Sequence, residues 1–553
     1  MESQRGLLFV ALLVVSYLLF NQWQMDKVEV NPITETTTPA SQANSTETGG
    51  SNEFLPEGST DTTPALASTA ADTIVIRSDV LELVVTTQGG DIVSAKLLDF
   101  ETEQGSNVPM PILTTNGYTF VAESGLVGAN GPDSTRSGLP RPVYSVSSDI
   151  FEIGEADTLM VPFTYQRDGL TFVKNFILTR GKYDLNVKYD INNNSQNAAS
   201  MQLFGQLKQS VNVDTGSSLM MPTYRGAAFS TVDTKYEKYD FDDIESEKLN
   251  QTTKAGWVAM LQHYFVSAWV PQNDLTNTLY TNYSDDKATI GFLSPTINIA
   301  PGASASTEAT FYVGPKNQAA LEKVAEGLEL TVDYGFLWMI SQPLFALLMF
   351  IQGIVVNWGL AIICITIVVK TFLYPLTKTQ YTSMAKMRKI QPKMQALKER
   401  YGNDRQKMSQ AMMELYKKEK VNPAGGCLPL LLQMPIFLAL YWVFMESVEL
   451  RHAEFGLWIT DLSSKDPYYI LPILMGASMF LMQKLQPAMS QDPMQQKMMQ
   501  WMPVFFTFFF LWFPSGLVLY WLVSNVITII QMLIIFRSIE KAEEKDKLAK
   551  KSS

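Results

Sequence analysis

One basic residue stands out because it lies inside an apolar segment. Lys370 is the only charged residue between Asp333 and Lys378. An ammonium group in hydrocarbon is costly, so such a residue usually contacts a polar partner or a wet cavity. Thr366 precedes it by one helical turn on the same face. Alternatively, Lys378 is only eight residues further on, so the Lys370 amine could extend toward the headgroups there.

A second group of polar side chains recurs in the last apolar segment, which we place at about 517 to 536. They are spaced three or four residues apart and form one stripe on a helix: Tyr520, Ser524, Thr528 and Gln531. Trp521 and Asn525 flank the stripe, and Gln433 adds a polar group between Pro429 and Pro435. Facing lipid, these groups would lack hydrogen bonds, so we expect them to face a wet cavity or other helices. Hydrogen bonding between helices alone would also explain the stripe.

A basic, methionine-rich segment follows the apolar segment that contains Lys370. Residues 376–421 predict a helical hairpin with its turn at Gly402-Asn403-Asp404. Its methionines lie near one stripe on each arm: Met384, Met387 and Met394, then Met408 and Met412. Methionine side chains adapt to varied apolar surfaces, which favours a receiving surface for apolar segments. The alternative is a hairpin whose methionine face packs on itself.

The sequence lacks the motifs of the common enzyme classes. There is no GxxxxGK[ST], serine elbow, HExxH or pair of carboxylates within the apolar segments. The two cysteines, Cys364 and Cys427, lie in or beside apolar segments, and His263 and His452 are isolated. We therefore expect no enzymatic activity, no cofactor, no disulfide framework and no metal site.

Charge and hydropathy divide the chain into two bodies. Residues 24–335 carry 19 Lys and Arg against 39 Asp and Glu, a net charge of −20, whereas residues from 336 onward carry 23 against 14, a net charge of +9. An acidic polar body is unlikely to bind nucleic acid. We expect a multi-domain membrane protein and no specific DNA binding.

The polar body predicts an antiparallel β-sandwich over residues 74–333. Leu81 to Thr86, Gly89-Gly90 and Ile92 to Leu97 have the pattern of a β-hairpin, and polar and apolar residues alternate from Tyr183 to Asn192. A short helix is expected near 317–328. Residues 31–73 are rich in Thr, Ser, Pro, Ala and Gly, which predicts a flexible linker, placed at 24–73.

The apolar residues predict six membrane spans. Gly6 to Phe20 is followed by Asn, Gln and Trp rather than a small-x-small cleavage site, so we favour an uncleaved anchor over residues 1–23 rather than a signal peptide. An interfacial helix is placed at 334–351 because Gln342-Pro343 and Gln352-Gly353 interrupt the apolar character. The second span lies within 352–375 and the third to sixth within 422–536, at about 428–445, 467–482, 499–513 and 517–536.

Basic residues set the expected orientation. Residues 376–421 contain 12 Lys and Arg against four acidic residues, which places this hairpin in the cytoplasm. Parity then places both termini, including the tail at 537–553, in the cytoplasm and the acidic domain outside. In a bacterium the location would be the inner membrane and the periplasm. The fourth and fifth spans are short, which predicts a thinned bilayer beside them.

Four stretches closely resemble the YidC family of bacterial membrane protein insertases, in its long form with a large periplasmic domain. They are YPLTKTQYTSMAKMRKIQPKMQALKERYG at 374–402, NPAGGCLPLLLQMPIFLALYW at 422–442, DPYYILPILMGASMF at 466–480 and FFLWFPSGLVLYWLVSN at 509–525. The resemblance covers the whole membrane part and the order of its segments. The polar body resembles the family mainly in position and β character.

The resemblance implies a five-helix core around a hydrophilic groove, open to cytoplasm and lipid and closed outward. The family's groove charge falls on Lys370, where well-known members carry arginine, so positive charge rather than the guanidinium fork would be required. Trp521 stands where tyrosine is usual. The matching groove positions are Thr366, Gln433, Trp512, Tyr520, Trp521, Ser524 and Asn525.

These observations favour an insertase and folding chaperone that moves client transmembrane segments from the cytoplasm into the inner membrane. The resemblance implies action alone or with the Sec translocon and its accessory subunits. Further expected partners are nascent membrane proteins, the lipid bilayer and, weakly because the tail is short, the ribosome. A polytopic solute transporter is the alternative, although it would normally show an internal repeat and paired ionisable groups. A ligand receptor anchored by its spans would leave Lys370 and the polar stripe unexplained.

Overall fold

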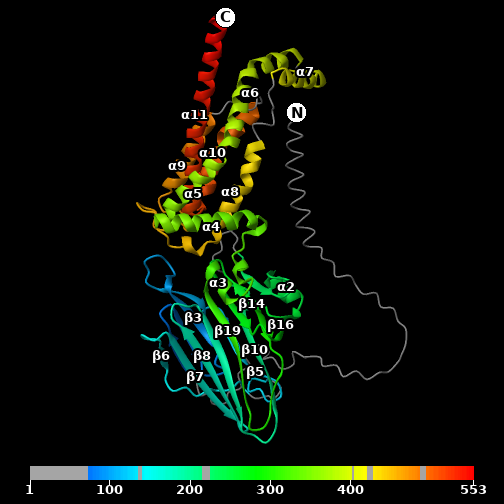
Figure 1. Cartoon of the computed structure of the whole chain (residues 1–553), viewed down its shortest axis with the longest axis vertical. Helices are drawn as coiled ribbons and strands as arrows, with labels where there is room; N and C mark the ends of the chain where they lie inside the picture. Colours follow the sequence, from blue (N-terminus) through cyan, green and yellow to red (C-terminus); the bar gives the residue numbers. More distant parts are fainter. Residues whose placement is uncertain are drawn as a thin grey trace, which may run out of the picture. The chain divides into compact units, whose positions relative to one another are not determined.

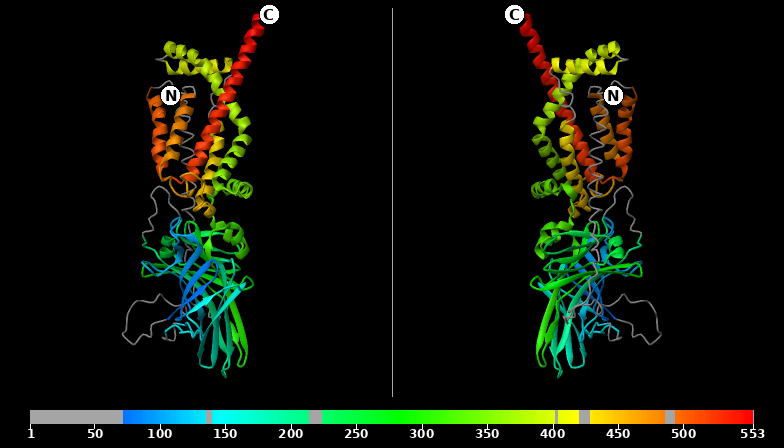
Figure 2. Two further views of the ribbon diagram at one scale, coloured as in Figure 1. Left: turned by 90° about the vertical axis from the view of Figure 1, so that its left-hand side faces the viewer. Right: turned by 90° about the vertical axis from the view of Figure 1, so that its right-hand side faces the viewer.

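The computed structural model describes residues 72–134, 140–213, 224–401, 404–419, 428–485 and 493–552 (Figures 1 and 2). The predicted anchor at 1–23, nearly all of the predicted linker at 24–73, and Gly402, Asn403 and Cys427 lie outside these residues. The described residues form a β domain followed by a helical region.

The first sheet of the β domain has eleven strands and is antiparallel except where β1 pairs with β6. Its main order is β13-β16-β17-β10-β5-β3-β2-β1-β6, with β18 paired to β10 and β4 to β3. The strands are β1 (Thr73–Arg77), β2 (Leu81–Thr86), β3 (Ile92–Glu101), β4 (Pro109–Leu113), β5 (Phe120–Val127), β6 (Ile150–Glu152), β10 (Ala199–Ser210), β13 (Asn250–Lys254), β16 (Thr276–Ser284), β17 (Lys287–Leu293) and β18 (Ile297–Ile299).

The second sheet has eight antiparallel strands in the order β12-β11-β14-β15-β19-β9-β8-β7. They are β7 (Thr158–Arg167), β8 (Leu170–Thr179), β9 (Asp184–Asn193), β11 (Gly226–Ser230), β12 (Glu237–Tyr239), β14 (Trp257–Leu261), β15 (Phe265–Pro271) and β19 (Ser304–Pro315).

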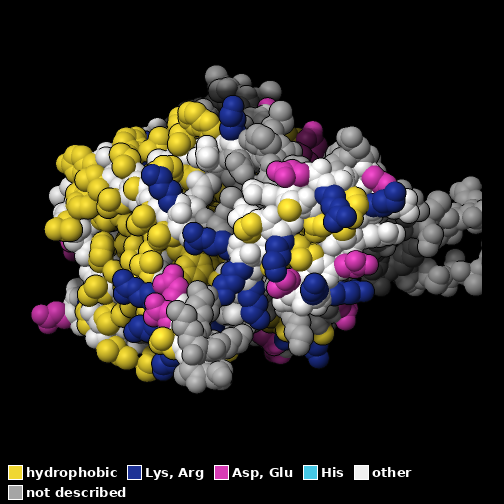
Figure 3. Space-filling model, turned by 90° about the horizontal axis from the view of Figure 1, so that it is seen from above, with side chains coloured by type: hydrophobic (Ala, Val, Ile, Leu, Met, Phe, Trp, Pro, Cys, Tyr) yellow, Lys and Arg dark blue, Asp and Glu magenta, His cyan; other side chains and the backbone are white. Residues whose placement is uncertain are grey.

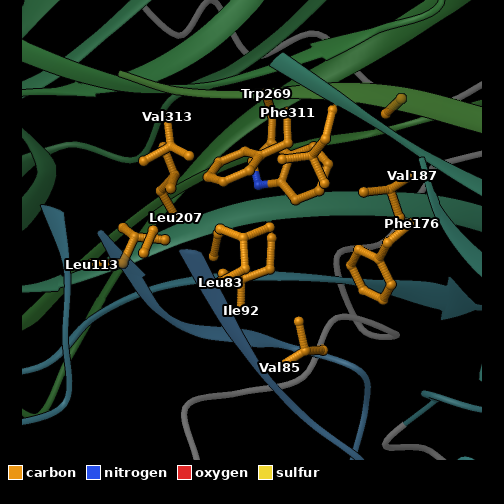
Figure 4. Packing of buried hydrophobic residues seen from close by; sticks show 14 of the residues in the cluster. Leu83, Val85, Ile92, Leu113, Phe176, Val187, Leu207, Trp269, Phe311 and Val313 are labelled. Atoms are coloured by element: carbon orange, nitrogen blue, oxygen red, sulfur yellow. The ribbon is translucent and has the colours of Figure 1, made fainter. Parts of the chain in front are cut away.

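One apolar core joins the two sheets. Figure 4 shows Leu83, Ile92 and Leu207 of the first sheet facing Trp269 and Phe311 of the second. All five are at most 1% exposed. Burying such side chains contributes about 1.5 to 3 kcal/mol each, which makes this shared core the main stabilising element of the domain.

The predicted local elements of the β domain are confirmed. β2 and β3 form the expected hairpin, and Gly89 and Gly90 in its turn have φ of 73° and 64°, which suits glycine. Alternate residues of β9 are buried, as its period of two predicts. The expected short helix is α3 (Gln318–Val324), which begins after Asn317, whose side chain accepts from the Ala320 amide. A capped turn, α2 (Phe241–Ser246), and η3 (Leu328–Thr331) complete the domain.

The apolar helix after the β domain ends later than predicted. η4 (Gly335–Leu337) leads into α4 (Trp338–Val355), which runs without a break through Pro343 and Gln352-Gly353. The apolar run thus divides into two helices as predicted, but the break follows Val355, four residues beyond the predicted end at 351. Pro343 lies inside the helix, and α4 ends only where Val356 adopts φ 57°.

The basic hairpin is helical as predicted. α5 (Trp358–Phe372) is followed, after a bend of 62°, by α6 (Tyr374–Tyr401) and then by α7 (Arg405–Lys418). Asp404 caps α7 by accepting a hydrogen bond from the Lys407 amide. α6 and α7 contact each other.

The remaining helices are α8 (Leu428–Glu446), α9 (Ile470–Leu485), α10 (Pro493–Phe509) with η7 (Phe510–Trp512), and α11 (Ser515–Ser552). η6 (Val448–Leu450) follows α8. α11 packs against α5, α6 and α9, while α9 also contacts α10 (Figure 2). The segment after residue 427 thus supplies helices at the four predicted positions.

By length and composition, two helices within the described ranges could cross a membrane, Gly335–Val355 and Ser515–Ala542, or three if the bent pair α5 and α6 forms one span. Ile470–Leu485 and Gln500–Trp512 are shorter apolar helices. Figure 3 shows broad hydrophobic areas on one face, with Lys and Arg side chains gathered beside them. Large exposed apolar side chains on α4 and α5, such as Phe350 and Phe372, are typical of a surface in contact with lipid.

Candidate functional site

Lys370 lies in the last turn of α5 and is only 6% exposed. Asn357 fixes the other end of this helix by accepting a hydrogen bond from the Leu360 amide. The Lys370 ammonium donates to Thr528 Oγ1 of α11 at 3.1 Å. The amine therefore points toward α11.

Lys370 follows residues of α5 that belong to an apolar cluster. Its neighbours in α5, Ile362, Ile365 and Val369, belong to the buried cluster of the helical region. Within the described residues Lys370 makes no ion pair, and an ammonium group has three N–H donors. A desolvated cation with a single neutral side-chain partner retains the capacity to bind an anionic or polar group.

Thr366 is on the same helix but does not open onto a cavity. It is 0% exposed, and its hydroxyl donates to the Ile362 carbonyl at 2.6 Å. The hydrogen-bonding capacity of this side chain is thus engaged within α5. The predicted shared face with Lys370 is correct, and both residues are buried.

The aromatic residues of the stripe pack against α8 and the end of α10. Tyr520 is 4% exposed and stacks on Phe437 with ring centroids 6.1 Å apart. Trp521 meets Phe437 edge to face at 4.6 Å and Phe510 at 4.7 Å. These rings form one side of the apolar packing around α11.

The other polar residues of α11 divide between two neighbours. Asn525 Nδ2 donates to Ser478 Oγ of α9 at 3.0 Å, so Asn525 joins two helices. Ser524 is half-buried, and its carbonyl accepts from the Thr528 hydroxyl at 2.7 Å. The stripe predicted to face other helices does so, toward α5 at Thr528 and Gln531.

Two predicted groove residues stand apart from this network. Gln433 of α8 is half-buried, and Trp512 in η7 is 38% exposed and meets Phe508 edge to face. In the part of the chain that the structure describes, no hydrogen bond links either residue to Lys370. The structure therefore brings together Lys370, Thr528 and Gln531, and leaves Gln433 and Trp512 on separate helices.

The methionines of the hairpin do not share one free surface. Met384 is 4% exposed and packs with Tyr381, Met532 and Ile535, which ties α6 to α11. The other four are half-buried: Met387, Met394, Met408 and Met412. The Tyr416 hydroxyl donates to Met394 Sδ at 3.9 Å across α6 and α7. The hairpin thus packs partly on itself, as its alternative interpretation holds.

Three residues that make these contacts are not among the predicted groove residues, and Thr528, which accepts from Lys370, is the first of them. Gln531, like Thr528, belongs to the predicted stripe on α11, whereas Ser478 lies on α9 and belongs to no predicted group. A small polar residue inside an apolar helix is the signal that would have indicated Ser478. Among the described residues no group of three or more His, Cys, Asp and Glu side chains could hold a metal ion.

A two-sheet domain is joined to apolar helices long enough to cross a membrane, and among their described residues Lys370 is buried; these features indicate a membrane protein. Comparisons with known protein families identify which class of membrane protein it is. Residues 73–347 match the family described as YidC periplasmic domain, and residues 350–543 match the family described as 60Kd inner membrane protein.

Full-length relatives agree with these matches. The membrane protein insertase YidC of Shewanella sp. (strain W3-18-1) is 55% identical, covering 98% of this chain and 99% of that protein. The membrane protein insertase YidC of Pseudoalteromonas atlantica is 54% identical, covering 99% of this chain and 100% of that protein. A crystal structure of an active YidC insertase with its first transmembrane domain resolved covers 84% of this chain and 94% of that one, at 20% identity and a TM-score of 0.37.

The chain belongs to the YidC family of membrane protein insertases. Its function is membrane protein insertion, its clients are membrane proteins, and it works in the lipid bilayer of the inner membrane with a periplasmic β domain. The solute-transporter alternative is thereby set aside.

Proposed function

We propose that insertion proceeds through a polar groove in which Lys370 attracts acidic or polar residues at the end of a client segment. The observation that carries this proposal is the burial of Lys370 of α5 against α11, where, among the described residues, the Thr528 hydroxyl is its one side-chain hydrogen-bond partner. A cation left without a carboxylate partner binds a passing anion more readily than one already paired. The client's apolar helix then passes α8 and α10 into lipid.

The energetics require no hydrolysable fuel, and we propose that the chain is not an enzyme. Each central Leu or Ile of a client contributes roughly 0.3 to 0.6 kcal/mol toward insertion. Moving one negative charge outward gains about 2.3 kcal/mol per 100 mV of inside-negative potential. The insertion free energy of about ten apolar residues is therefore comparable, in order of magnitude, to the free-energy cost of placing one charge in a thinned bilayer.

The lengths of the helices support such thinning. α5 has 15 residues and α9 has 16, about 22 to 24 Å of helix, whereas roughly 20 residues span a typical hydrocarbon core. We propose that these helices, with α8, α10 and α11, are the second to sixth of six spans and surround the groove. A thinner bilayer beside them lowers the barrier for a polar segment.

We also propose the orientation and the domain limits predicted from the sequence. The net charge of +8 over 376–421 favours a cytoplasmic hairpin and cytoplasmic termini. The domains would be the anchor at 1–23, the linker at 24–73, a β-sandwich at 74–333, an interfacial helix from 334 and the cytoplasmic tail at 537–553. The basic hairpin could also contact the ribosome weakly, and the Sec translocon with its accessory subunits is a further proposed partner.

Substitutions at Lys370 test the groove. In cells depleted of their own insertase, we expect Lys370→Arg to support client insertion and Lys370→Ala to reduce it several-fold, measured by protease protection of the translocated end. Lys378→Ala is the matched control, because it removes the same charge at an exposed position one helix further on. Equal insertion by the wild type, Lys370→Ala and Lys370→Arg would contradict the proposal.

Crosslinking locates the path of the client. Cysteines at positions 433 and 521, both half-buried, are expected to crosslink to a stalled client. A cysteine at position 366 is the internal control, because Thr366 is fully buried and should not react. Labelling at 366 alone would place the client elsewhere.

A further inference from the structure

α11 holds Lys370 at two points. The ammonium donates to Thr528 Oγ1 at 3.1 Å, and Gln531 Nε2 donates to the Lys370 carbonyl oxygen at 3.2 Å. Thr528 and Gln531 are three residues apart and so lie on one face of α11. One face of a single helix therefore contacts both the side chain and the backbone of Lys370.

The backbone contact has a local cause. α5 ends at Phe372, and its cap amide, that of Leu373, donates to the Val369 carbonyl, so the following carbonyl, that of Lys370, lies at the helix end, where the regular intrahelical bonds stop. Gln531 supplies a donor to this carbonyl from α11. This contact fixes the end of α5 at the residue that carries the cation.

The side-chain contact has a defined polarity. The Thr528 hydroxyl donates its proton to the Ser524 carbonyl at 2.7 Å, which leaves its oxygen lone pairs to accept from Lys370. The hydroxyl cannot serve as a donor to a client at the same time. Thr528 is thus oriented to accept from the ammonium group and to hold it at α11.

We infer that Thr528 and Gln531 are positioning residues that hold the Lys370 amine in the groove, and that insertion of clients with an acidic leading segment depends on them. This inference rests on the proposed function of Lys370. Without the two contacts, the lysine side chain would be free to turn toward the headgroups, where it would still be charged but out of reach of the client.

The test compares two clients that differ only by Asp or Asn in the leading segment, inserted into proteoliposomes by the full-length protein. The wild type is expected to favour the Asp client. Thr528→Val keeps the shape of the side chain and should reduce this preference about fivefold, while Thr528→Ser restores it. Gln531→Leu should also weaken the preference. Its effect on stability should be small, because the substitution also removes the buried Oε1 atom, which has no protein partner within the described residues.

Thr371→Val is the matched control. Thr371 is adjacent to Lys370 but exposed, and its hydroxyl donates within α5 to the Ile367 carbonyl. Insertion of an uncharged client and thermal stability in detergent report whether each variant is folded. A merely structural role for Thr528 would lower insertion of Asp, Asn and uncharged clients alike, and that result would overturn the inference.

Lys370→Ala separates the two proposals. If Lys370→Ala abolishes the Asp preference while Thr528→Val and Gln531→Leu keep it, the positioning role is wrong and the role of the cation stands. If Lys370→Ala keeps the preference, the proposed function of the cation is wrong. The rate of acylation of the Lys370 amine, measured against pH, gives a second readout, and an unchanged profile in Thr528→Val would also contradict positioning.

Discussion

Gly476 of α9 lies directly against Thr507 of α10, because a Cβ at position 476 would be 1.8 Å from Thr507 Oγ1. The two short helices approach as closely as they do because residue 476 has no side chain. We expect Gly476→Ala to force them apart and to lower stability by about 1 to 3 kcal/mol. Thermal unfolding of the full chain in detergent measures this loss.

Two variants control this prediction. Gly353→Ala introduces the same methyl group in α4, where no atom lies within 4 Å, and should be neutral or stabilise by up to about 1 kcal/mol. Thr507→Ala combined with Gly476→Ala should recover part of the loss, because the nearest atom is removed. Additive effects of the two substitutions would show that the pair does not interact.

Local elements could be predicted from the sequence, whereas long-range partners could not. The β2–β3 hairpin follows from alternation and two glycines, and the α11 stripe follows from residue spacing. The pairing of β13 with β16 and the contact of Asn525 with Ser478 depend on residues far apart in the chain. The end of helix α4 was placed four residues too early, because a Gln-Gly dipeptide weakens a helix without necessarily ending it.

Lys174 provides a prediction for the β domain. Its buried ammonium donates to the carbonyls of Gly89, Gly90 and Ser124 at 3.1, 2.7 and 3.1 Å, which fastens the β2–β3 turn to β5 and β8. Lys174→Met keeps the length of the side chain and removes all three bonds. We expect a loss of roughly 3 to 5 kcal/mol, because it also leaves the neighbouring buried charges with fewer partners.

Hydrogen exchange of the peptide that contains residues 81–101 should report this loss as faster exchange. Lys96→Met is the control, because its ion pair with Glu82 is at the surface, with the lysine side chain 42% exposed, and contributes at most about 1 kcal/mol. Equal effects of the two substitutions would mean that the turn is held by its own backbone.

Asp466 gives a prediction for the loop between α8 and α9. This carboxylate is 1% exposed and accepts hydrogen bonds from Trp458 Nε1 and from the amides of Tyr468 and Leu471. Asp466→Ala leaves three donors without their acceptor and should cost about 2 to 4 kcal/mol. Asp466→Asn keeps one acceptor oxygen and should cost less.

Thermal unfolding and the fluorescence of Trp458 would follow this change. Glu454→Ala in the same loop is the control, because Glu454 is exposed and its removal should change stability by no more than about 0.5 kcal/mol. If Asp466→Ala proves as mild as Glu454→Ala, the loop is held by its apolar contacts.

His263 predicts a pH dependence of the β domain. Burial and then the neighbouring Lys316 ammonium lower the pKa of His263 to about 4. Between pH 4 and 6.5 the unfolded state therefore binds a proton that the folded state does not. The stability contributed by neutral His263 is complete above pH 6.5 and is lost as the pH falls toward 4, by up to roughly 3 kcal/mol.

The measurement is simple because the chain has only two histidines. In NMR spectra of the imidazole protons, the chemical shift of one histidine should stay that of the neutral ring down to about pH 4. The variant His452→Gln assigns the two signals. His263→Phe keeps a ring beside Tyr264, on which the imidazole stacks at 3.8 Å, and should flatten the dependence of unfolding on pH between 4 and 6.5. A resonance of His263 that titrates near pH 6.5 would mean that burial does not exclude the proton, and the acid sensitivity of the domain would then arise from its carboxylates.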